Sequence, residues 1–220
     1  FSTARKAEQN QVWVGMSKET AHQLGTPLSS MIGWIELLKE DPKTEHIAKE
    51  LSKDIDRLNV VTDRFSKIGS QPKLEKSELI NIIEEAINYF DARTGESVKF
   101  EKILSSSVQL VLSRSLFEWV IENLIKNALD AMEGKGTITI SVEEQSDRVY
   151  IDISDTGKGI PQSQFKSVFQ PGYTSKKRGW GLGLSLSKRI IKEYHNGKIY
   201  VLKSEMGKGT TFRISLKKTI

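Results

Sequence analysis

The chain has 220 residues, a length that suits one or two domains. Apolar residues make up 37% of the sequence, and with glycine they approach the globular average, which excludes a disordered or collagen-like chain. The absence of cysteine excludes disulfide frameworks, thiolate zinc sites and thiol nucleophiles. No run approaches the roughly 18 apolar residues of a membrane-spanning helix, and no signal-peptide core opens the chain, so we expect a soluble, cytoplasmic fragment of a longer protein.

The formal net charge is +5. Acidic and basic side chains balance over residues 1–70, so the whole surplus lies in residues 71–220. The basic residues form no dense block with interleaved aromatic residues. We therefore expect an ordinary solvated surface and no nucleic-acid partner.

The first seventy residues are predicted to form two helices joined by a turn at residues 40–43. Apolar side chains recur at helical spacing in both. They are Leu24, Leu28, Met31, Ile35 and Leu38 in the first helix and Leu51, Ile55, Leu58, Val61, Phe65 and Ile68 in the second. Because one stripe on each of two helices encloses little core, the pattern favours a homodimer in which residues 1–70 form a four-helix bundle.

Gly69 to Pro72 is the best linker candidate, since glycine favours a helix C-terminus and proline cannot extend the helix. We therefore expect domains at residues 1–70 and 71–220. In the second, helices are predicted at 77–90, 115–132 and 183–194, and strands at 97–102, 108–112, 136–143, 148–153, 198–202 and 210–216. This order predicts an α+β chain whose second domain is an α/β sandwich, one sheet with helices on one face.

Two groups of polar residues in the second domain suit a nucleotide site. Asn123 and Asn127 are four residues apart and share one face of an otherwise apolar helix. Such amides either cap nearby backbone or offer oxygen ligands to Mg²⁺. Asp155 follows a strand directly, and Gly157 and Gly159 let the backbone approach a flat ligand, although the same residues also suit a plain turn.

Two further glycine motifs follow. Gly179, Gly181 and Gly183 run into a helix, where backbone N–H groups suit a phosphate chain. The basic and hydroxyl residues 173–178 before them suit a mobile lid over a polyphosphate, or a solvated loop. Gly207, Gly209 and Thr210 precede the last strand, where a hairpin turn is the simplest interpretation.

Taken in order, these motifs resemble the N, G1, F, G2 and G3 boxes of the ATP-binding domain of sensor histidine kinases. The residues that carry the resemblance are Asn123 and Asn127; Asp155, Gly157 and Gly159; Phe165 and Phe169; Gly179, Gly181, Leu182, Gly183 and Leu184; and Gly207, Gly209 and Thr210. The resemblance implies a Bergerat-type α/β sandwich that binds ATP and Mg²⁺ through these boxes.

The resemblance also implies a role for individual residues. Asn127 would be the Mg²⁺ ligand and Asn123 would lie near the phosphates. Asp155 would accept a hydrogen bond from the adenine amino group, and Thr210 would line the adenine end. The stretch 170–183 would be the ATP lid, in which Lys176 would contact a phosphate.

His22 lies in a segment, residues 18–28, that is similar to the phosphoacceptor H box of the same family. It is two residues from Leu24, about 200° around the helix, so we expect an exposed imidazole. Pro27 lacks the N–H that would bond to Gln23, which predicts a bend beside His22. Of the other two histidines, His46 is expected at the surface and His195 as a helix C-terminal cap.

The implied reaction is attack of the neutral His22 imidazole on the γ-phosphoryl group of ATP, followed by transfer to an aspartate of a response-regulator receiver domain. In many members the hydroxyl at the position of Thr26 orients water for the reverse, phosphatase reaction. Many members also have an acidic residue directly after the histidine, where this chain has Gln23. Glu19, one turn before His22, is the candidate base. Membrane attachment, if any, would come from a region before residue 1.

Two other functions stay open at this point. An ATP-hydrolysing clamp of the gyrase, Hsp90 and MutL type has a general-base glutamate four residues before the Mg²⁺ asparagine. Here that position is Asn123, and Glu122 is one residue out of register, which argues against hydrolysis. A non-catalytic dimeric phosphotransfer scaffold is the third reading, favoured only if Gln23 disables autophosphorylation.

Overall fold

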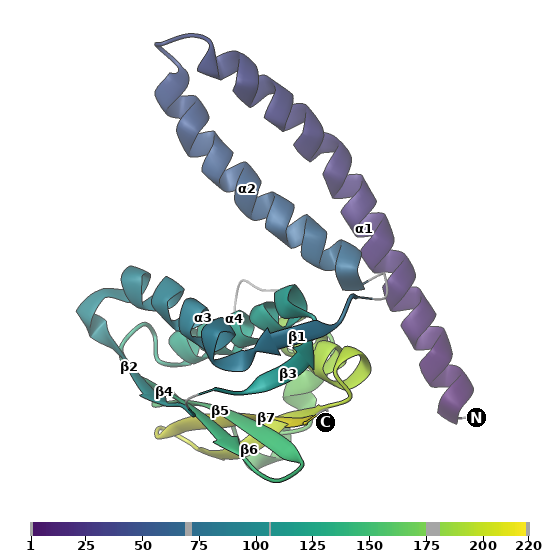
Figure 1. The fold of residues 1–220 in the computed structure, drawn as a ribbon, viewed down its shortest axis with the longest axis vertical. Coiled ribbons are helices and arrows are strands. Elements are labelled where there is room, and N and C mark those ends of the chain that lie inside the picture. Colours follow the sequence, from purple (N-terminus) through teal and green to yellow (C-terminus); the bar gives the residue numbers. More distant parts are fainter. Residues whose placement is uncertain (1, 69–71, 106, 175–180, 219–220) are drawn as a thin grey trace. The chain divides into compact units, whose positions relative to one another are not determined.

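The computed structural model describes residues 2–68, 72–105, 107–174 and 181–218. The chain divides into two compact units, Phe1–Pro72 and Lys73–Ile220, which we describe separately (Figure 1). The predicted linker residues Gly69, Ser70 and Gln71 lie outside the described residues. None of the described helices combines the length and apolar character needed to cross a membrane.

The first unit is a helical hairpin of α1 (Ser2–Lys39) and α2 (Glu45–Ile68). The turn between them is fixed by Thr44, whose hydroxyl donates to the carbonyl oxygen of Leu38 at 2.7 Å. The backbone N–H of Glu45 bonds to the carbonyl of Asp41 at 3.0 Å and starts α2. Helix α1 continues through Pro27 without a break.

The hairpin leaves several residues of each predicted apolar stripe exposed. Leu28 and Ile35 of α1 pack with Ala48 and Ile55 of α2, and Leu38 packs against this cluster. Of the stripe residues whose side chains the structure describes, five others are open to solvent in the single chain. Their exposed fractions are 39% for Leu24, 47% for Met31, 42% for Leu51, 46% for Leu58 and 41% for Val61. One hairpin therefore leaves a continuous apolar surface without cover.

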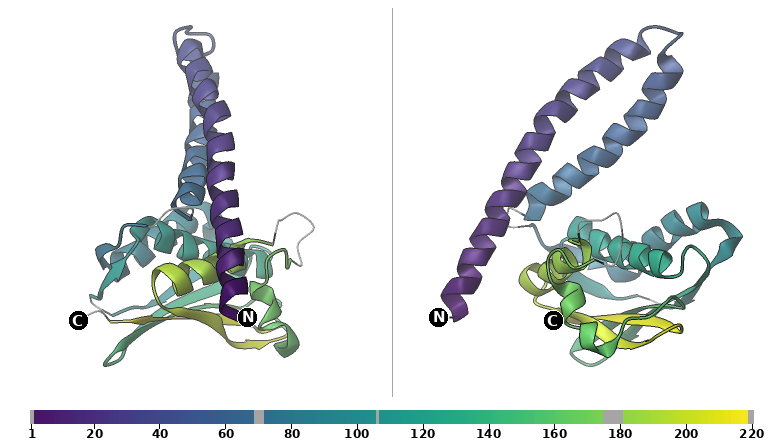
Figure 2. Two further views of the ribbon diagram at one scale, coloured as in Figure 1. Left: turned by 90° about the vertical axis from the view of Figure 1, so that its right-hand side faces the viewer. Right: turned by 180° about the vertical axis from the view of Figure 1, so that it is seen from behind.

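The second unit is a five-stranded sheet with helices on one face, as predicted (Figures 1 and 2). The strand order is β2-β4-β5-β7-β6, and only the β2–β4 pairing is parallel. The strands are β2 (Val98–Ile103), β4 (Gly136–Glu144), β5 (Arg148–Asp155), β6 (Lys198–Glu205) and β7 (Gly209–Lys217). The covering helices are α3 (Leu79–Thr94), α4 (Arg114–Ala131) and α5 (Gly183–Arg189).

The structure adds elements that the sequence did not predict. Strand β1 (Glu75–Glu78) pairs antiparallel with β3 (Gln109–Leu112) in a separate two-stranded sheet. The predicted helix 183–194 is α5 followed by a π-helical turn, Ile190–Tyr194. Short 3-10 turns lie at Gly95–Ser97, Gln162–Gln164 and Ser167–Phe169. The predicted start of the helix at residue 77 is two residues early, because Glu78 is the N-cap of α3 and accepts from Ile80 N.

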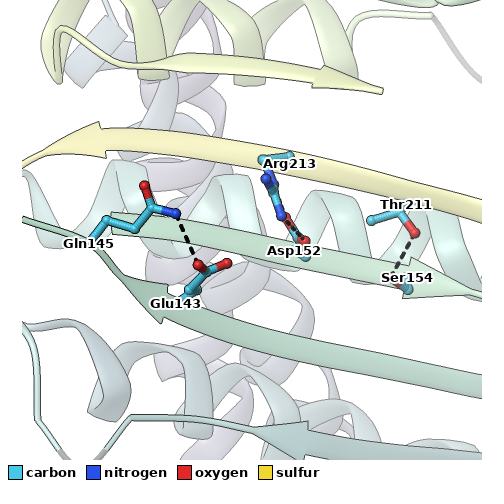
Figure 3. Close-up of polar contacts among 6 residues, drawn as sticks. All are labelled: Glu143, Gln145, Asp152, Ser154, Thr211 and Arg213. Carbon is cyan, nitrogen blue, oxygen red and sulfur yellow. Dashed lines mark hydrogen bonds and ion pairs between the residues drawn. The ribbon is translucent and has the colours of Figure 1, made fainter. Parts of the chain in front are cut away.

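Successive side chains along each strand point to opposite faces of the sheet. Ile138, Ile151 and Ile153 are fully or almost fully buried on the face that α4 covers. The opposite face carries polar pairs between neighbouring strands (Figure 3). Arg213 donates two hydrogen bonds of 2.7 Å to Asp152, and the hydroxyls of Ser154 and Thr211 are 2.8 Å apart. Asp155, one position after Ser154, and Thr210, one position before Thr211, therefore point to the helix side.

Candidate functional site

Asn123 of α4 lies against the start of α5. Its Nδ2 donates a hydrogen bond of 2.9 Å to the hydroxyl oxygen of Ser187, which is buried on α5. Its Oδ1 is so close to Gly183 that a Cβ added there would lie 2.4 Å from it. Two predicted site residues, from segments about sixty positions apart in the sequence, are therefore in contact, and a side chain at position 183 would displace the Asn123 carboxamide.

Asn127 is half-buried on α4, one turn after Asn123 and on the same face. Among the described residues there is no group of three or more His, Asp or Glu side chains that could hold a metal ion. Mg²⁺ commonly takes one or two protein oxygens and completes its coordination with phosphate oxygens and water. The amide oxygen of Asn127 fits that kind of site.

Asp155 ends β5 and is 8% exposed. Its Oδ1 accepts a hydrogen bond of 2.8 Å from the backbone N–H of Gly157, and the backbone N–H of Thr210 also donates to this carboxylate. Burial raises the pKa of Asp155 above its usual value, and these two N–H groups oppose that rise. The carboxylate is thus held in place on the helix side of the sheet.

Gly159 brings the loop after Asp155 against the end of β6. Its φ of +76° lies in the left-handed region, and a Cβ there would be 2.3 Å from the carbonyl oxygen of Glu205. The neighbouring Lys158 carbonyl accepts from Gly207 N at 2.8 Å. The G1 and G3 motifs, about fifty residues apart, therefore form one structure at this end of the sheet.

The described ends of the predicted lid are tied together. The N–H of Gly172 donates to the carbonyl of Gly181 at 3.1 Å. Before them, the ring of Phe169 is buried edge-on against Phe212, with centroids 6.1 Å apart, while Phe165 is half-buried. Leu182 directly precedes α5. The predicted lid residues Lys176 and Gly179 lie outside the described residues.

Two serines that sequence reasoning missed contact predicted site residues. Ser187 receives the Asn123 amide. Ser204 of β6 is the register partner of Thr210 on β7, and their hydroxyl oxygens are 2.9 Å apart. Serine fits no motif by itself, but the hairpin predicted around Gly207 places Ser204 and Thr210 at the same distance from the turn. That symmetry is the signal that would have found Ser204.

In the first unit, His22 is exposed near the middle of α1, as predicted. The Thr26 hydroxyl lies one turn on and donates to the His22 carbonyl oxygen at 3.5 Å, the upper limit for a hydrogen bond. The side chain of Gln23 donates from Nε2 to Oε1 of Glu19 at 2.7 Å. His22 is therefore surrounded by the polar groups of one exposed helix face.

The other two histidines lie away from this face. His46 is exposed on α2, as expected. His195 caps the end of the π-helical turn through Nδ1, 2.9 Å from the carbonyl of Ile190, and its Nε2 accepts from the N–H of Ser113 at 3.1 Å. Since a carbonyl only accepts, the proton is on Nδ1 and the ring is neutral. Burial lowers the pKa of His195.

The two units are thus an α/β sandwich that carries the predicted nucleotide-site residues and a helical hairpin with an exposed histidine. Residues 15–71 match the family model of the His Kinase A (phospho-acceptor) domain. Residues 113–220 match the model of the histidine kinase-, DNA gyrase B- and HSP90-like ATPases. The chain belongs to the sensor histidine kinases of two-component systems.

Curated relatives match almost the whole of this chain. The chain is 26% identical over 219 residues to sporulation kinase C of Bacillus subtilis (strain 168), covering 97% of this chain and 51% of that protein. It is 32% identical over 223 residues to sensor histidine kinase ZraS of Salmonella typhi, covering 97% and 48%. The chain therefore spans about half the length, or less, of the curated relatives it matches.

Solved structures agree with the fold. The catalytic domain of histidine kinase ThkA is 27% identical with a TM-score of 0.61, covering 66% of this chain and 96% of that one. ThkA in complex with the response regulator protein TrrA is 24% identical with a TM-score of 0.63, covering 98% and 65%. The family match settles that the second unit is an ATP-binding domain.

Proposed function

We propose that this chain is the kinase module that transfers the γ-phosphoryl group of ATP to its own His22. The observation that carries the proposal is the presence, in one chain, of an exposed histidine in a phosphoacceptor hairpin and a nucleotide site built on Asp155, Asn123 and Gly183. A nitrogen of the neutral imidazole attacks the γ-phosphorus in line, ADP leaves, and the ring loses its N–H proton.

Each site residue has its own role in this reaction. Asp155 accepts from the adenine amino group, which fixes the base at the buried end of the site. Asn123 of α4, which lies against the start of α5, is beside the phosphate chain, where helix N–H groups favour negative charge. Asn127 is the residue that would hold Mg²⁺, which offsets phosphate charge when bound. Lys176 and the backbone of the G2 motif would cover the phosphates. Positioning then supplies most of the rate.

Partners and location are part of the proposal. The exposed residues of the apolar stripes support a homodimer through residues 1–70, in which a second hairpin completes a four-helix bundle. We propose an aspartate of a response-regulator receiver domain as the phosphoryl acceptor, since the related ThkA was solved with such a regulator. Thr26 would orient water for a phosphatase reaction. We propose that this chain lies in the cytoplasm, because ATP is a cytoplasmic metabolite.

Incubation with γ-labelled ATP and Mg²⁺ tests the proposal. Acid-labile, base-stable label on the protein, lost in His22→Ala and kept in His46→Ala, is the expected result, because His46 is an exposed histidine outside the H box. Free phosphate without labelled protein would instead indicate an ATP-hydrolysing clamp. Neither product would indicate a non-catalytic scaffold.

A further inference from the structure

His195 joins the end of the π-helical turn to the start of α4. Its Nδ1 donates to the carbonyl of Ile190 at 2.9 Å, and its Nε2 accepts from the backbone N–H of Ser113 at 3.1 Å. Ser113 is the N-cap of α4. The imidazole also lies edge-on to the fully buried ring of Phe117, one turn into α4, with ring centroids 5.8 Å apart. One side chain therefore holds the first turn of α4 against the segment that follows α5.

The same two segments are in contact a second time, at the nucleotide site. Asn123, ten positions after Ser113, donates to Ser187 of α5 and lies against Gly183. Because Ser187 comes before His195 in the chain, the two segments run antiparallel and are attached at two levels. At 1.5 Å per residue, these levels are about 15 Å apart along α4. Two attachments at this separation set both the sliding and the tilt of α5 against α4.

Helix α5 depends on such contacts for its position. It has seven residues, Gly183 to Arg189, and helices this short are not stable by themselves in water. If His195 lost its accepting nitrogen, the Ser113 N–H would be left unpaired or would need room for a water molecule, and both are unfavourable. A shift of the turn relieves this cost. Because α5 runs directly into the turn, Gly183 then moves against Asn123 as well.

We propose that His195 is a positioning residue for phosphate binding, which keeps the start of α5 beside Asn123 through its bond to Ser113. The inference rests on the proposed nucleotide site, in which Asn123 lies beside the phosphate chain and Asp155 receives the base. His195 belongs to neither part and acts only through the placement of α5. Its loss should therefore weaken the binding of the phosphates and leave the binding of the adenosine portion unchanged.

Dissociation constants of ATP with Mg²⁺ and of adenosine, measured on the whole 220-residue chain, test this inference. Adenosine carries the base and ribose without the phosphates, and NMR titration measures weak as well as tight binding. His195→Phe keeps an aromatic ring against Phe117 but has no polar atom. Its ATP dissociation constant should rise about fivefold, the order of one lost hydrogen bond, and its adenosine constant should stay that of the parent.

His195→Gln is the rescue variant. Its amide nitrogen can donate to the Ile190 carbonyl and its amide oxygen can accept from Ser113, so both bonds of the imidazole can be replaced. The ring contact with Phe117 is lost in this variant. Both dissociation constants should nevertheless stay close to those of the parent, because the proposal assigns the effect to the hydrogen bonds.

Ser113→Pro removes the same hydrogen bond from its donor side and is the second variant if His195→Phe does not fold. Proline has no N–H, the φ of −81° at Ser113 is close to the value that proline requires, and the preceding Leu112 is the extended last residue of β3. The ATP dissociation constant should rise as in His195→Phe. Ser113→Ala keeps the backbone N–H and loses only a hydroxyl that does not cap α4, so this matched control should bind ATP like the parent.

Equal losses of ATP and adenosine affinity in His195→Phe would make His195 a general support of the fold and overturn the inference. A His195→Gln variant that binds ATP as weakly as His195→Phe would overturn it as well. Unchanged ATP affinity in both His195→Phe and Ser113→Pro would also overturn it, while the proposed nucleotide site would stand. A parent protein that binds no ATP would contradict the proposed function itself, and the inference with it.

Discussion

The side chains of Gln23 and Glu19 form a hydrogen bond of 2.7 Å, from Nε2 of the amide to Oε1 of the carboxylate. Gln23 occupies the position directly after His22, where many histidine kinases have an acidic residue, and an amide cannot take up a proton there. Glu19 is three residues before His22, which places the two side chains on neighbouring positions of the helix surface. The pair therefore holds a carboxylate one turn from the phosphoacceptor.

Glu19→Gln should lower the rate of His22 phosphorylation if this carboxylate accepts the imidazole proton. General-base assistance is commonly worth about 10²-fold or more, so a fall on that order is expected in the single-turnover rate with γ-labelled ATP. Glu36→Gln, which removes an exposed carboxylate paired with Lys39 on the same helix, is the control and should leave the rate unchanged. Equal rates for Glu19→Gln and the parent would remove Glu19 from the mechanism.

Exchanging Glu19 and Gln23 tests whether the phosphorylation rate depends on having a carboxylate near His22 or on its exact position. Gln23→Glu alone places two carboxylates one turn apart, which costs roughly 0.2–0.5 kcal/mol of helix stability, and should change the phosphorylation rate. The double variant Glu19→Gln with Gln23→Glu can restore the hydrogen bond in the opposite direction and moves the carboxylate beside His22. It should recover a large part of the rate that Glu19→Gln loses. A double variant as slow as Glu19→Gln would show that no carboxylate at either position assists.

The fold was more predictable from the sequence than the contacts within the site. For helices and strands with clear apolar periodicity, such as those that carry Leu124 and Ile151, the predicted first and last residues are within a few positions of those in the structure. Strand β1 was missed because Glu75–Glu78 has no apolar alternation, and it forms only by pairing with β3. The role of Ser187 depends on Asn123, 64 residues away, which spacing along the chain does not reveal.

His195 should make the stability of the second unit depend on pH. Its pKa is lowered in the folded protein because burial disfavours the charged ring, whereas in the unfolded chain it lies near 6.5. The unfolded state therefore binds more protons at acidic pH. This contribution is complete above about pH 6.5 and is lost as the pH falls below it, with a slope of at most about 1.4 kcal/mol per pH unit.

Urea denaturation of the chain between pH 7.5 and 5.5 measures this effect. The parent should lose free energy of unfolding more steeply than His195→Gln, whose side chain does not titrate. His46→Gln removes an exposed histidine and should keep the slope of the parent. Identical slopes for the parent and His195→Gln would contradict the assignment of a buried neutral ring.

Leu58→Asp tests the dimer through the exposed residues of the α2 stripe. Leu58 is 46% exposed in the single chain, and in a symmetric bundle its replacement would bury a charge twice. We expect the dimer dissociation constant to rise on the order of 100-fold, measured by analytical ultracentrifugation. Val60 is 48% exposed but two residues on, about 200° around the helix, so Val60→Asp should leave the dimer intact. Equal effects of both variants would argue against this face as the interface.

Gly183→Ala should disturb the nucleotide site with little loss of stability. The added Cβ would lie 2.4 Å from Oδ1 of Asn123, so the carboxamide must move and its bond to Ser187 is lost. Because this atom ends a flexible side chain, the fold can adapt, while Asn123 leaves the position beside the phosphates. The ATP dissociation constant should rise about tenfold, as for one lost hydrogen bond, with an unchanged melting temperature.

Gly33→Ala, a glycine in α1 with no atom within 4 Å of the added Cβ, is the control and should bind ATP like the parent. Unaltered ATP affinity in Gly183→Ala would show that the orientation of Asn123 does not matter for nucleotide binding.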